Sequence, residues 1–288
     1  MFLDKLKSGE PAFSCEFFPP KTDAGWQTLA RTLSDLRPLG LDFVSVTCGA
    51  GGTVRDLTAG LVDRTVNEFG LPTVGHLTCA GSSVAELRER LRAYRASGVC
   101  AVMALRGDPP KGESRFVPHP EGFAHANELV RLVKSEFPEL KIGCAAYPDM
   151  HPESPDRLTD VRMLRLKQDC GADFAVTQLF FRNSDYFGFC ELARSEGVTI
   201  PIVPGIMPVS SAKQLAKSAS LGNSPLPEEL QALMAREDDI SAEGFEYTLA
   251  QCRGLLERGA PGIHFYTLNH SDASARLIAA LRESAPGT

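Results

Sequence analysis

A recurring unit, a glycine followed by a short apolar run, constrains this chain more than any other feature. The unit reads GLDFVSVT from Gly40, GLPTVGHLT from Gly70, GVCAVMALRGD from Gly98, GADFAVTQLFF from Gly171, GVTIPIVPGI from Gly197 and GAPGIHFYTLN from Gly259. The first three starts lie 30 and 28 residues apart, a period typical of repeated supersecondary units. Glycine in this place indicates the left-handed end of a helix, with a strand starting directly after it.

Two further apolar runs, at 12–18 and 141–147, bring the number of predicted strands to eight. Amphipathic helical patterns separate the strands, at residues 83–97, 156–170, 227–236 and 242–258. Strands that are apolar on both faces and alternate with helices pair in parallel. Eight such units predict an α/β protein with a (β/α)8 TIM-barrel fold, in which residues 1–288 form a single catalytic domain. A doubly wound open sheet is the alternative.

The charge balance argues against several classes of partner. The chain carries 30 basic and 36 acidic residues, a net charge of −6, whereas nucleic-acid-binding chains normally show a basic excess. No apolar run approaches the roughly 18–20 residues of a membrane span, and the charged N-terminal segment has no apolar signal core. We therefore expect a cytoplasmic protein whose partners are small molecules, without nucleic acid or membrane.

Metal and phosphate motifs are missing from the sequence. The eight cysteines are scattered singly, without a C-x-x-C pair, so we expect reduced thiols and no zinc ribbon. The six histidines show no metal-ligand spacing, and His264, inside a predicted strand, is interpreted as a core histidine. The glycines at 49–52 lack the third glycine of a dinucleotide-binding fingerprint. No metal is predicted.

In barrels of this kind the chemistry lies at the carboxyl ends of the strands. Polar residues follow the predicted strands at Glu16, Thr47, His76, Thr78, Arg106, Asp108, Tyr147, Gln178, Tyr266, Thr267 and Asn269. Glu16 is the most informative, because a carboxyl group within the apolar run SCEFF is disfavoured in its charged form and could hold a proton near neutral pH. The alternatives are a glutamate paired with an arginine inside the barrel and, for Asp108, an aspartate that caps a turn.

The segments at these strand ends resemble those of the methylenetetrahydrofolate reductase family. They read SCEFFPPKT, FVSVTCGAGG, GHLTC, ALRGDPP, AAYPDMHPE, GADFAVTQLFF, PIVPGIMPVS and HFYTLN, in order from residue 14 to residue 269. The resemblance implies an oxidoreductase of bacterial type that binds FAD without a covalent link. It implies ping-pong reduction of 5,10-methylenetetrahydrofolate to 5-methyltetrahydrofolate by NADH or NADPH. It also implies a homo-oligomer without the regulatory domain of eukaryotic members, acting in one-carbon metabolism and methionine biosynthesis.

The same resemblance implies roles for single residues. Glu16 matches the general acid and Asp108 the aspartate beside flavin and folate, so both would be catalytic. Positions that hold FAD match Thr47, His76, Arg106, Gly107, Asp108, His125, Ala126, Tyr147, His151, Asp160 and Lys167. Positions that contact substrate match Glu16, Asp108, Gln178, Gln214 and His270. The chain departs from many family members at His125, Met163, Leu166, Ser218 and His270, the last of which stands in place of an arginine.

Two other functions stay open at this point. The barrel could be a flavin- or folate-binding subunit that receives electrons from a partner protein. It could also be another flavin-barrel dehydrogenase, which would need no buried acid on its first strand. The presence of both Glu16 and Asp108 favours catalysis by this chain.

Overall fold

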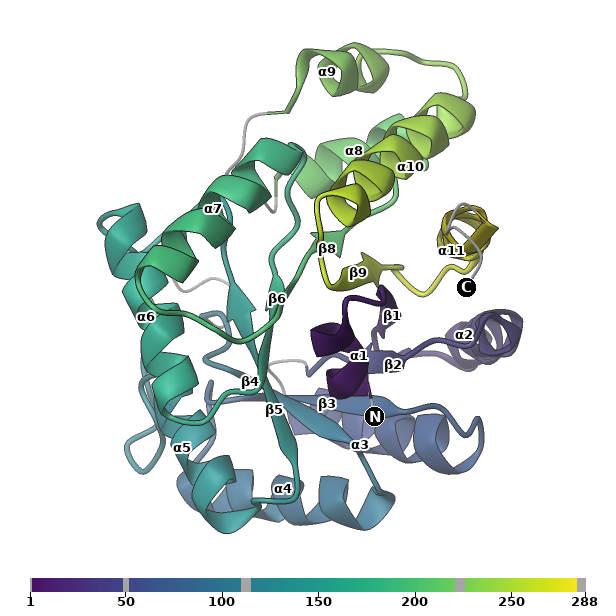
Figure 1. Cartoon of the computed structure of the whole chain (residues 1–288). Helices are drawn as coiled ribbons and strands as arrows, with labels where there is room; N and C mark the ends of the chain where they lie inside the picture. Colours follow the sequence, from purple (N-terminus) through teal and green to yellow (C-terminus); the bar gives the residue numbers. More distant parts are fainter. Residues whose placement is uncertain (1, 49–51, 110–114, 221–225, 284–288) are drawn as a thin grey trace.

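The computed structural model describes residues 2–48, 52–109, 115–220 and 226–283, and it shows a ring of parallel strands surrounded by helices (Figure 1). In chain order the elements are α1 (Phe2–Ser8), β1 (Ala12–Phe17), α2 (Asp23–Leu36), the 3-10 helix η1 (Arg37–Leu39), β2 (Phe43–Val46), α3 (Gly52–Asn67), β3 (Thr73–Thr78), α4 (Val84–Ser97), β4 (Ala101–Leu105), α5 (Ala126–Glu136), β5 (Lys141–Ala146), α6 (Arg157–Asp169), β6 (Phe174–Thr177), α7 (Asn183–Ser195), β7 (Ile202–Val203), β8 (Gly205–Ile206), α8 (Ala212–Ala219), α9 (Glu228–Met234), α10 (Ser241–Glu257), β9 (Gly262–Tyr266) and α11 (Asp272–Glu283).

The strands close into a barrel through an interrupted seventh strand. The nine described strands run in the order β7-β6-β5-β4-β3-β2-β1-β9-β8. Only Pro204 separates β7, which pairs with β6, from β8, which pairs with β9. Since proline has no N–H group to donate to a ladder, the strand changes partner at this residue. β7 and β8 therefore share one position in a ring of eight, which confirms the (β/α)8 prediction and shows the open-sheet alternative to be wrong.

The repeat glycines have the backbone that the sequence predicts. Gly40, Gly70, Gly98, Gly171, Gly197 and Gly259 all have positive φ, between 62° and 117°. Gly98 caps the C-terminus of α4, where its N–H group donates to the carbonyl groups of Tyr94 and Arg95. At the other end of α4, Ser83 and Glu86 form a capping box, which satisfies main-chain donors at the helix start. The repeat thus ends each of these helices or turns and starts the next strand.

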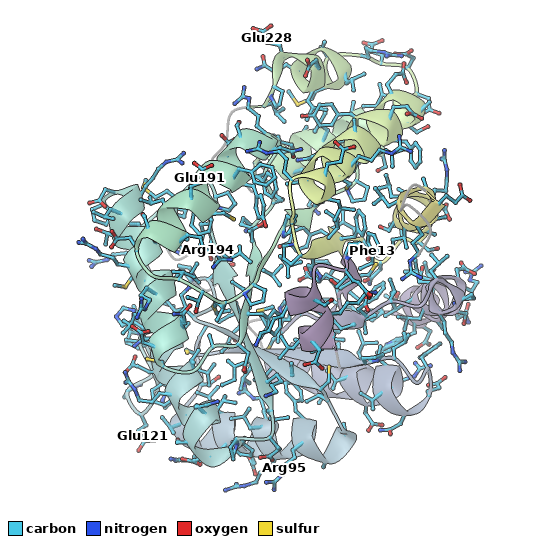
Figure 2. All side chains as sticks on the ribbon, viewed as in Figure 1. Phe13, Arg95, Glu121, Glu191, Arg194 and Glu228 are labelled. Atoms are coloured by element: carbon cyan, nitrogen blue, oxygen red, sulfur yellow. The ribbon has the colours of Figure 1, made fainter. Side chains whose placement is uncertain are left out.

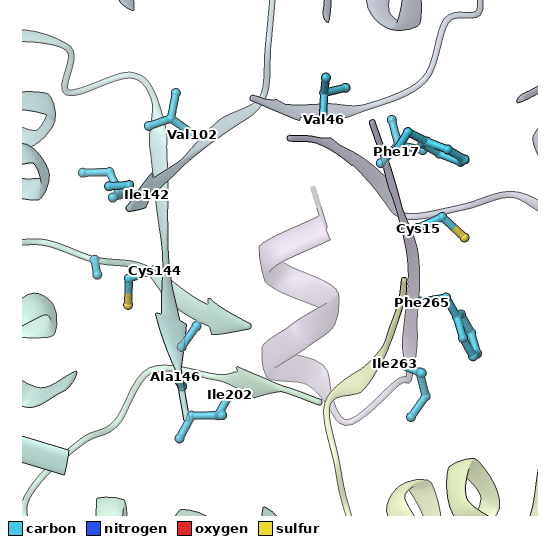
Figure 3. Close-up of a cluster of buried hydrophobic side chains, with 14 of the residues drawn as sticks. Cys15, Phe17, Val46, Val102, Ile142, Cys144, Ala146, Ile202, Ile263 and Phe265 are labelled. Carbon is cyan, nitrogen blue, oxygen red and sulfur yellow. The ribbon is translucent and has the colours of Figure 1, made fainter. Parts of the chain in front are cut away.

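The core has two layers around the strands. Cys15, Phe17, Val102, Ile142 and Phe265 point outward from the ring, into the layer between strands and helices (Figure 3). The inner layer at the amino ends of the strands is filled by Phe2 of α1, whose ring centroid lies 4.8 Å from that of Phe43 and 5.3 Å from that of Phe174. Helix α1 closes this end of the barrel, so that the opposite end is the one open to ligands.

A satellite cluster stands beside the carboxyl ends of the strands, where α8, α9 and α10 group together (Figure 1). It contains the buried side chains of Leu179, Phe181, Val209, Leu215, Leu226, Leu230 and Ile240. The helix predicted at 227–236 belongs to it as α9. This extra unit buries its own apolar surface and borders the functional end of the barrel.

Charged side chains lie at the periphery. Figure 2 shows Arg95 and Glu121 at the lower edge of the molecule, and Glu191 and Arg194 are also exposed, whereas Phe13 is buried. Across the 2–48, 52–109, 115–220 and 226–283 stretches, no helix combines the length and the apolar character that a membrane crossing requires. The outer surface is thus polar and mixed in charge.

Candidate active site

A cavity of about 810 Å³ opens at the carboxyl ends of the strands. The predicted site residues that line it are Glu16, Thr47, His76, Arg106, Gly107, Asp108, His125, Ala126, Tyr147, His151, Asp160, Lys167 and Gln178. Residues 49–51 and Pro110, which belong to the segments quoted above, lie outside the described residues. Positions spread over 163 residues of sequence, from 16 to 178, therefore meet at one cavity.

Glu16 sits at the end of β1 with only 8% of its surface exposed. Its Oε2 atom lies 3.5 Å from Nε2 of His76 and 3.9 Å from Nε2 of His264. In the part of the chain that the structure describes, these two histidines are the charged or chargeable partners within 4 Å of the carboxylate, and the arginine-paired alternative is wrong. Glu16 is therefore a buried acid without a permanent counter-cation.

His264 links Glu16 to the interior of the barrel. Its Nδ1 atom is 2.7 Å from the hydroxyl of Ser14, and its Nε2 atom is 3.3 Å from the hydroxyl of Ser45. Its ring stacks on Phe43 with the centroids 5.7 Å apart. The interpretation of His264 as a core histidine is thus confirmed, because its side chain is buried and hydrogen-bonded. In addition, His264 lines the cavity, which the sequence did not indicate. The pair of histidines and serines can hold and orient a proton beside Glu16.

His76 is held as a neutral imidazole. Burial lowers the pKa of His76, and the nearby Glu16 carboxylate opposes this shift without cancelling it. The main-chain carbonyl of His76 accepts a hydrogen bond of 2.8 Å from the hydroxyl of Tyr94. Its Nε2 atom is buried and has no hydrogen-bond partner among residues the structure describes. A polar atom of this kind at a cavity wall is suited to a ligand.

A cationic part of the cavity wall is built by Arg106 and Lys167. Arg106 forms two hydrogen bonds to the carboxylate of Glu153, one of them 2.7 Å from Nη2 to Oε1, and its guanidinium lies 4.8 Å from the ring centroid of Phe116. This pairing raises the pKa of Arg106 and lowers that of Glu153. The ammonium of Lys167 donates to the carbonyl of Ala145 at 2.7 Å. Since Glu153 also lines the cavity, an anionic ligand that binds Arg106 would have to share or replace this carboxylate.

Asp160 organises the loop between β5 and α6. Its carboxylate accepts hydrogen bonds from the main-chain N–H of His151 at 3.2 Å and from the hydroxyl of Ser154 at 3.1 Å. Tyr147 packs edge-on against His151, with the ring centroids 4.7 Å apart. Burial, helped by the charge of Asp108, raises the pKa of Tyr147 to about 12. The loop therefore presents a neutral phenol and an oriented imidazole to the cavity.

Two predicted substrate residues do not line the cavity. The Gln214 amide donates to Ser218 at 3.0 Å, and its oxygen accepts from the N–H of Ser210 at 3.3 Å. His270 is exposed. Their roles stay predictions. Phe18, Glu153 and Leu268 also line the cavity; they lie within the matching segments quoted above but were not among the predicted site residues.

A family model described as methylenetetrahydrofolate reductase matches residues 1–282. The chain belongs to the methylenetetrahydrofolate reductase family. Its members are oxidoreductases. 5,10-Methylenetetrahydrofolate reductase of Escherichia coli K12 is 37% identical over 270 residues, which cover 92% of this chain and 89% of that protein. Methylenetetrahydrofolate reductase (NADH) 1 of Arabidopsis thaliana is 36% identical over 294 residues, covering 96% of this chain and 50% of that protein.

The chain spans about half the length of the plant and yeast members of the methylenetetrahydrofolate reductase family that it matches. Among solved structures, a protein from Clostridium thermocellum that binds two copies of 5-methyl-5,6,7,8-tetrahydrofolic acid superposes with a TM-score of 0.66 at 15% identity, over 96% of both chains. Oxaloacetate acetylhydrolase superposes with a TM-score of 0.54 at 14% identity, over 98% of this chain and 82% of the other. At these identities the likeness shows the shared fold.

The structure also shows where the cysteines and the possible metal ligands of this family member lie. Within the described ranges, no three histidine, cysteine, aspartate or glutamate side chains are grouped so that they could hold a metal ion. All eight cysteines are free, as the scattered spacing predicts. Burial raises the pKa of the Cys100 and Cys190 thiols to about 11, so these thiols are protonated at neutral pH.

Proposed function

We propose that this chain is a 5,10-methylenetetrahydrofolate reductase that uses FAD, with NADH or NADPH as the hydride donor, in ping-pong order. The observation that carries the proposal is one cavity that joins a buried acid, Glu16, to the side chains of Arg106 and Lys167. The proposal is supported by the family and by relatives named as reductases of the same substrate. Residues 1–288 would act as one catalytic domain.

The residues present fit a dinucleotide cofactor. Gly107 has φ of 85°, and a Cβ atom there would lie 2.8 Å from Cβ of Ala80 and 3.1 Å from Cβ of Thr78, so only glycine keeps this main chain at the cavity wall. Arg106 and Lys167 would hold the pyrophosphate, and His125 and Ala126 the adenosine end. Thr47, His76, Tyr147 and His151 would contact the cofactor, while Asp160 keeps their loop in place. Bound FAD would supply the hydride transfer between nicotinamide and folate.

Glu16 would supply the proton. The methylene bridge of the substrate must open before it can be reduced, and a proton on the folate nitrogen drives this opening. The buried Glu16 carboxyl lies beside His76 and His264 and lines the cavity, which places it where it could pass a proton to a bound folate. Asp108 and Gln178, both at the cavity, would orient the folate ring. Gln214 and His270 do not line the cavity, and their contacts with substrate are a further part of the proposal.

A folate ligand is further supported by the fold neighbour from Clostridium thermocellum, which binds a reduced folate with the same architecture. This support concerns the ligand class, since the sequence identity is 15%. A cytoplasmic location and a homo-oligomeric assembly are parts of the same proposal. Size-exclusion chromatography tests the assembly.

One anaerobic spectroscopic titration tests the function. FAD-loaded protein should show flavin absorption that bleaches when NADH or NADPH is added and returns when methylenetetrahydrofolate follows. Bleaching without return would refute the folate reaction. Flavin bands that do not bleach with NADH or NADPH, but bleach when an added reductase protein supplies the electrons, would instead indicate a subunit that takes electrons from a partner.

A further inference from the structure

Two consecutive residues at the end of β9 have a backbone that side chains rarely adopt. Leu268 has φ of 51° and Asn269 has φ of 65°, both in the left-handed region. Asparagine tolerates this region through local hydrogen bonds, whereas leucine seldom occupies it. Such backbone strain persists only where surrounding contacts fix it, and it concentrates at functional sites. The side chain of Leu268 lines the cavity, so this strained turn forms part of the proposed active site.

The Asn269 side chain pairs with the main chain next to Glu16. Its Oδ1 atom accepts a hydrogen bond of 2.8 Å from the N–H of Phe18, and its Nδ2 atom donates one of 2.8 Å to the carbonyl of Phe18. The ladder between β1 and β9 ends at Glu16, and that between β1 and β2 ends at Phe17. Phe18 is thus the first residue beyond both ladders, and the amide of Asn269 replaces the strand neighbour that it lacks.

Thr267 holds the other side of Glu16. Its hydroxyl donates a hydrogen bond of 2.6 Å to the main-chain carbonyl of Glu16 and accepts one of 3.1 Å from the N–H of Asn269. The carbonyl of Asn269 accepts from the hydroxyl of Thr32 on α2 at 3.1 Å. The main chain of the segment from Glu16 to Phe18 is therefore held at both ends by the turn formed by residues 267–269.

We propose that Asn269 is a positioning residue for the Glu16 carboxyl. Its amide fixes the Phe18 peptide, and together with Thr267 it sets where the β1 end places Glu16 and the Phe18 ring in the cavity. The positive φ angles of Leu268 and Asn269 turn the main chain so that the Asn269 amide reaches Phe18. The inference deepens the proposed reductase function and rests on it for its kinetic test. Asn269 itself supplies no proton, because an amide does not titrate in this range.

The kinetic test separates the two half-reactions in FAD-loaded protein. Asn269→Ala should slow flavin reoxidation by methylenetetrahydrofolate about 10- to 100-fold, since small misplacement of a catalytic group has effects of this size. Flavin reduction by NADH should stay within about 3-fold, because it does not use the Glu16 proton. The pH dependence of reoxidation should also shift, which a general loss of stability would not produce.

Three further variants complete the comparison. Asn269→Gly should slow reoxidation as Asn269→Ala does, although glycine is unstrained at positive φ. Thr267→Val, nearly equal in shape, should slow reoxidation in the same direction and serves if the Asn269 variants fail to fold. Asn183→Ala is the matched control, since the Asn183 amide also donates to a main-chain carbonyl, that of Gln251 at 2.9 Å, away from Glu16. It should change neither half-reaction.

Two results would overturn the proposal. One is equal slowing of both half-reactions in Asn269→Ala, and the other is reoxidation at the unmodified rate in Asn269→Gly. If methylenetetrahydrofolate does not reoxidise the flavin in the unmodified protein, the proposed function fails.

The role of Asn269 in holding the main chain is then tested separately, by hydrogen exchange of the Phe18 amide. The Phe18 amide should be protected in the unmodified protein and in Asn183→Ala but not in Asn269→Ala. A Phe18 amide that exchanges equally in all three would contradict the inference.

Discussion

Glu16 carries the proposed proton chemistry, and its surroundings make the role testable with a nearly isosteric change. Glu16→Gln keeps the shape at β1 but removes the titratable group from beside His76 and His264. We expect reoxidation by methylenetetrahydrofolate to fall about 10²- to 10⁴-fold, the usual contribution of a general acid, while flavin reduction by NADH is nearly unchanged. Stopped-flow absorbance measures both steps. Glu68→Gln, which removes a surface partner of Arg64, is the control. Near-normal folate turnover in Glu16→Gln would remove Glu16 from the mechanism.

His76 predicts a pH dependence of stability. Burial lowers its pKa below the ordinary value of 6.5, so around that pH the unfolded chain binds more protons than the folded chain. This contribution to stability is complete above about pH 6.5 and is lost as the pH falls toward the folded-state pKa. Urea unfolding at pH 8 and at pH 5.5 should show a smaller loss of unfolding free energy in His76→Gln than in the unmodified protein. The exposed His270→Gln variant should retain the full loss, and equal losses in all three proteins would contradict the prediction.

The neighbours of Glu16 show where sequence reasoning stops at the residue scale. Glu16 could be predicted because the signal is local, a carboxylate in an apolar run. The Ser14–His264 hydrogen bond joins residues 250 positions apart, and it exists because β1 and β9 pair in the register Ser14 to His264. The distance between two residues in the sequence does not reveal which residues of β1 and β9 lie side by side. His264 was therefore assigned to the core, and its place beside Glu16 became visible only in the folded barrel.

At the scale of elements, the glycine repeat in the sequence was enough to predict most of the strands and the barrel that they form. Each glycine marks a place where the chain leaves a helix or turn through positive φ, and that requirement is local. Helix α1 was not predicted, because its seven residues are too few for an amphipathic period. The change of partner at Pro204 was also missed, since the apolar run from Ile200 to Ile206 reads as one strand. Both features depend on closure of the ring.

Helix α1 has a stability role that can be measured separately from catalysis. Phe2 fills the amino end of the barrel against Phe43 and Phe174. Phe2→Ala should lower the free energy of unfolding by about 3–5 kcal/mol, the usual cost of removing a buried phenylalanine ring. Flavin reduction should be unaffected, because the cavity lies at the other end of the strands. The control is Val117→Ala, at a side chain that is 67% exposed. Urea unfolding that gives the two variants equal stability would show that α1 does not close the barrel.

At the scale of the whole molecule, the cavity joins residues from strand ends all around the barrel, so a ligand bound there stabilises the fold as a unit. At 100 times its Kd, FAD should add about 2.7 kcal/mol to the free energy of unfolding. Arg106→Ala should lose most of this gain, because it removes the cation proposed to hold the pyrophosphate.

Arg88 offers a matched control for that measurement, since it also forms a hydrogen-bonded ion pair with a glutamate, Glu136, but on the outer surface. The expected result is an FAD-dependent rise in Tm at fixed salt that is equal in Arg88→Ala and the unmodified protein and small in Arg106→Ala. Since both variants free one glutamate from an ion pair, a difference between them reports the cavity rather than the loss of a salt bridge. An equal rise in all three proteins would place the pyrophosphate elsewhere, with Lys167 as the next cation to replace.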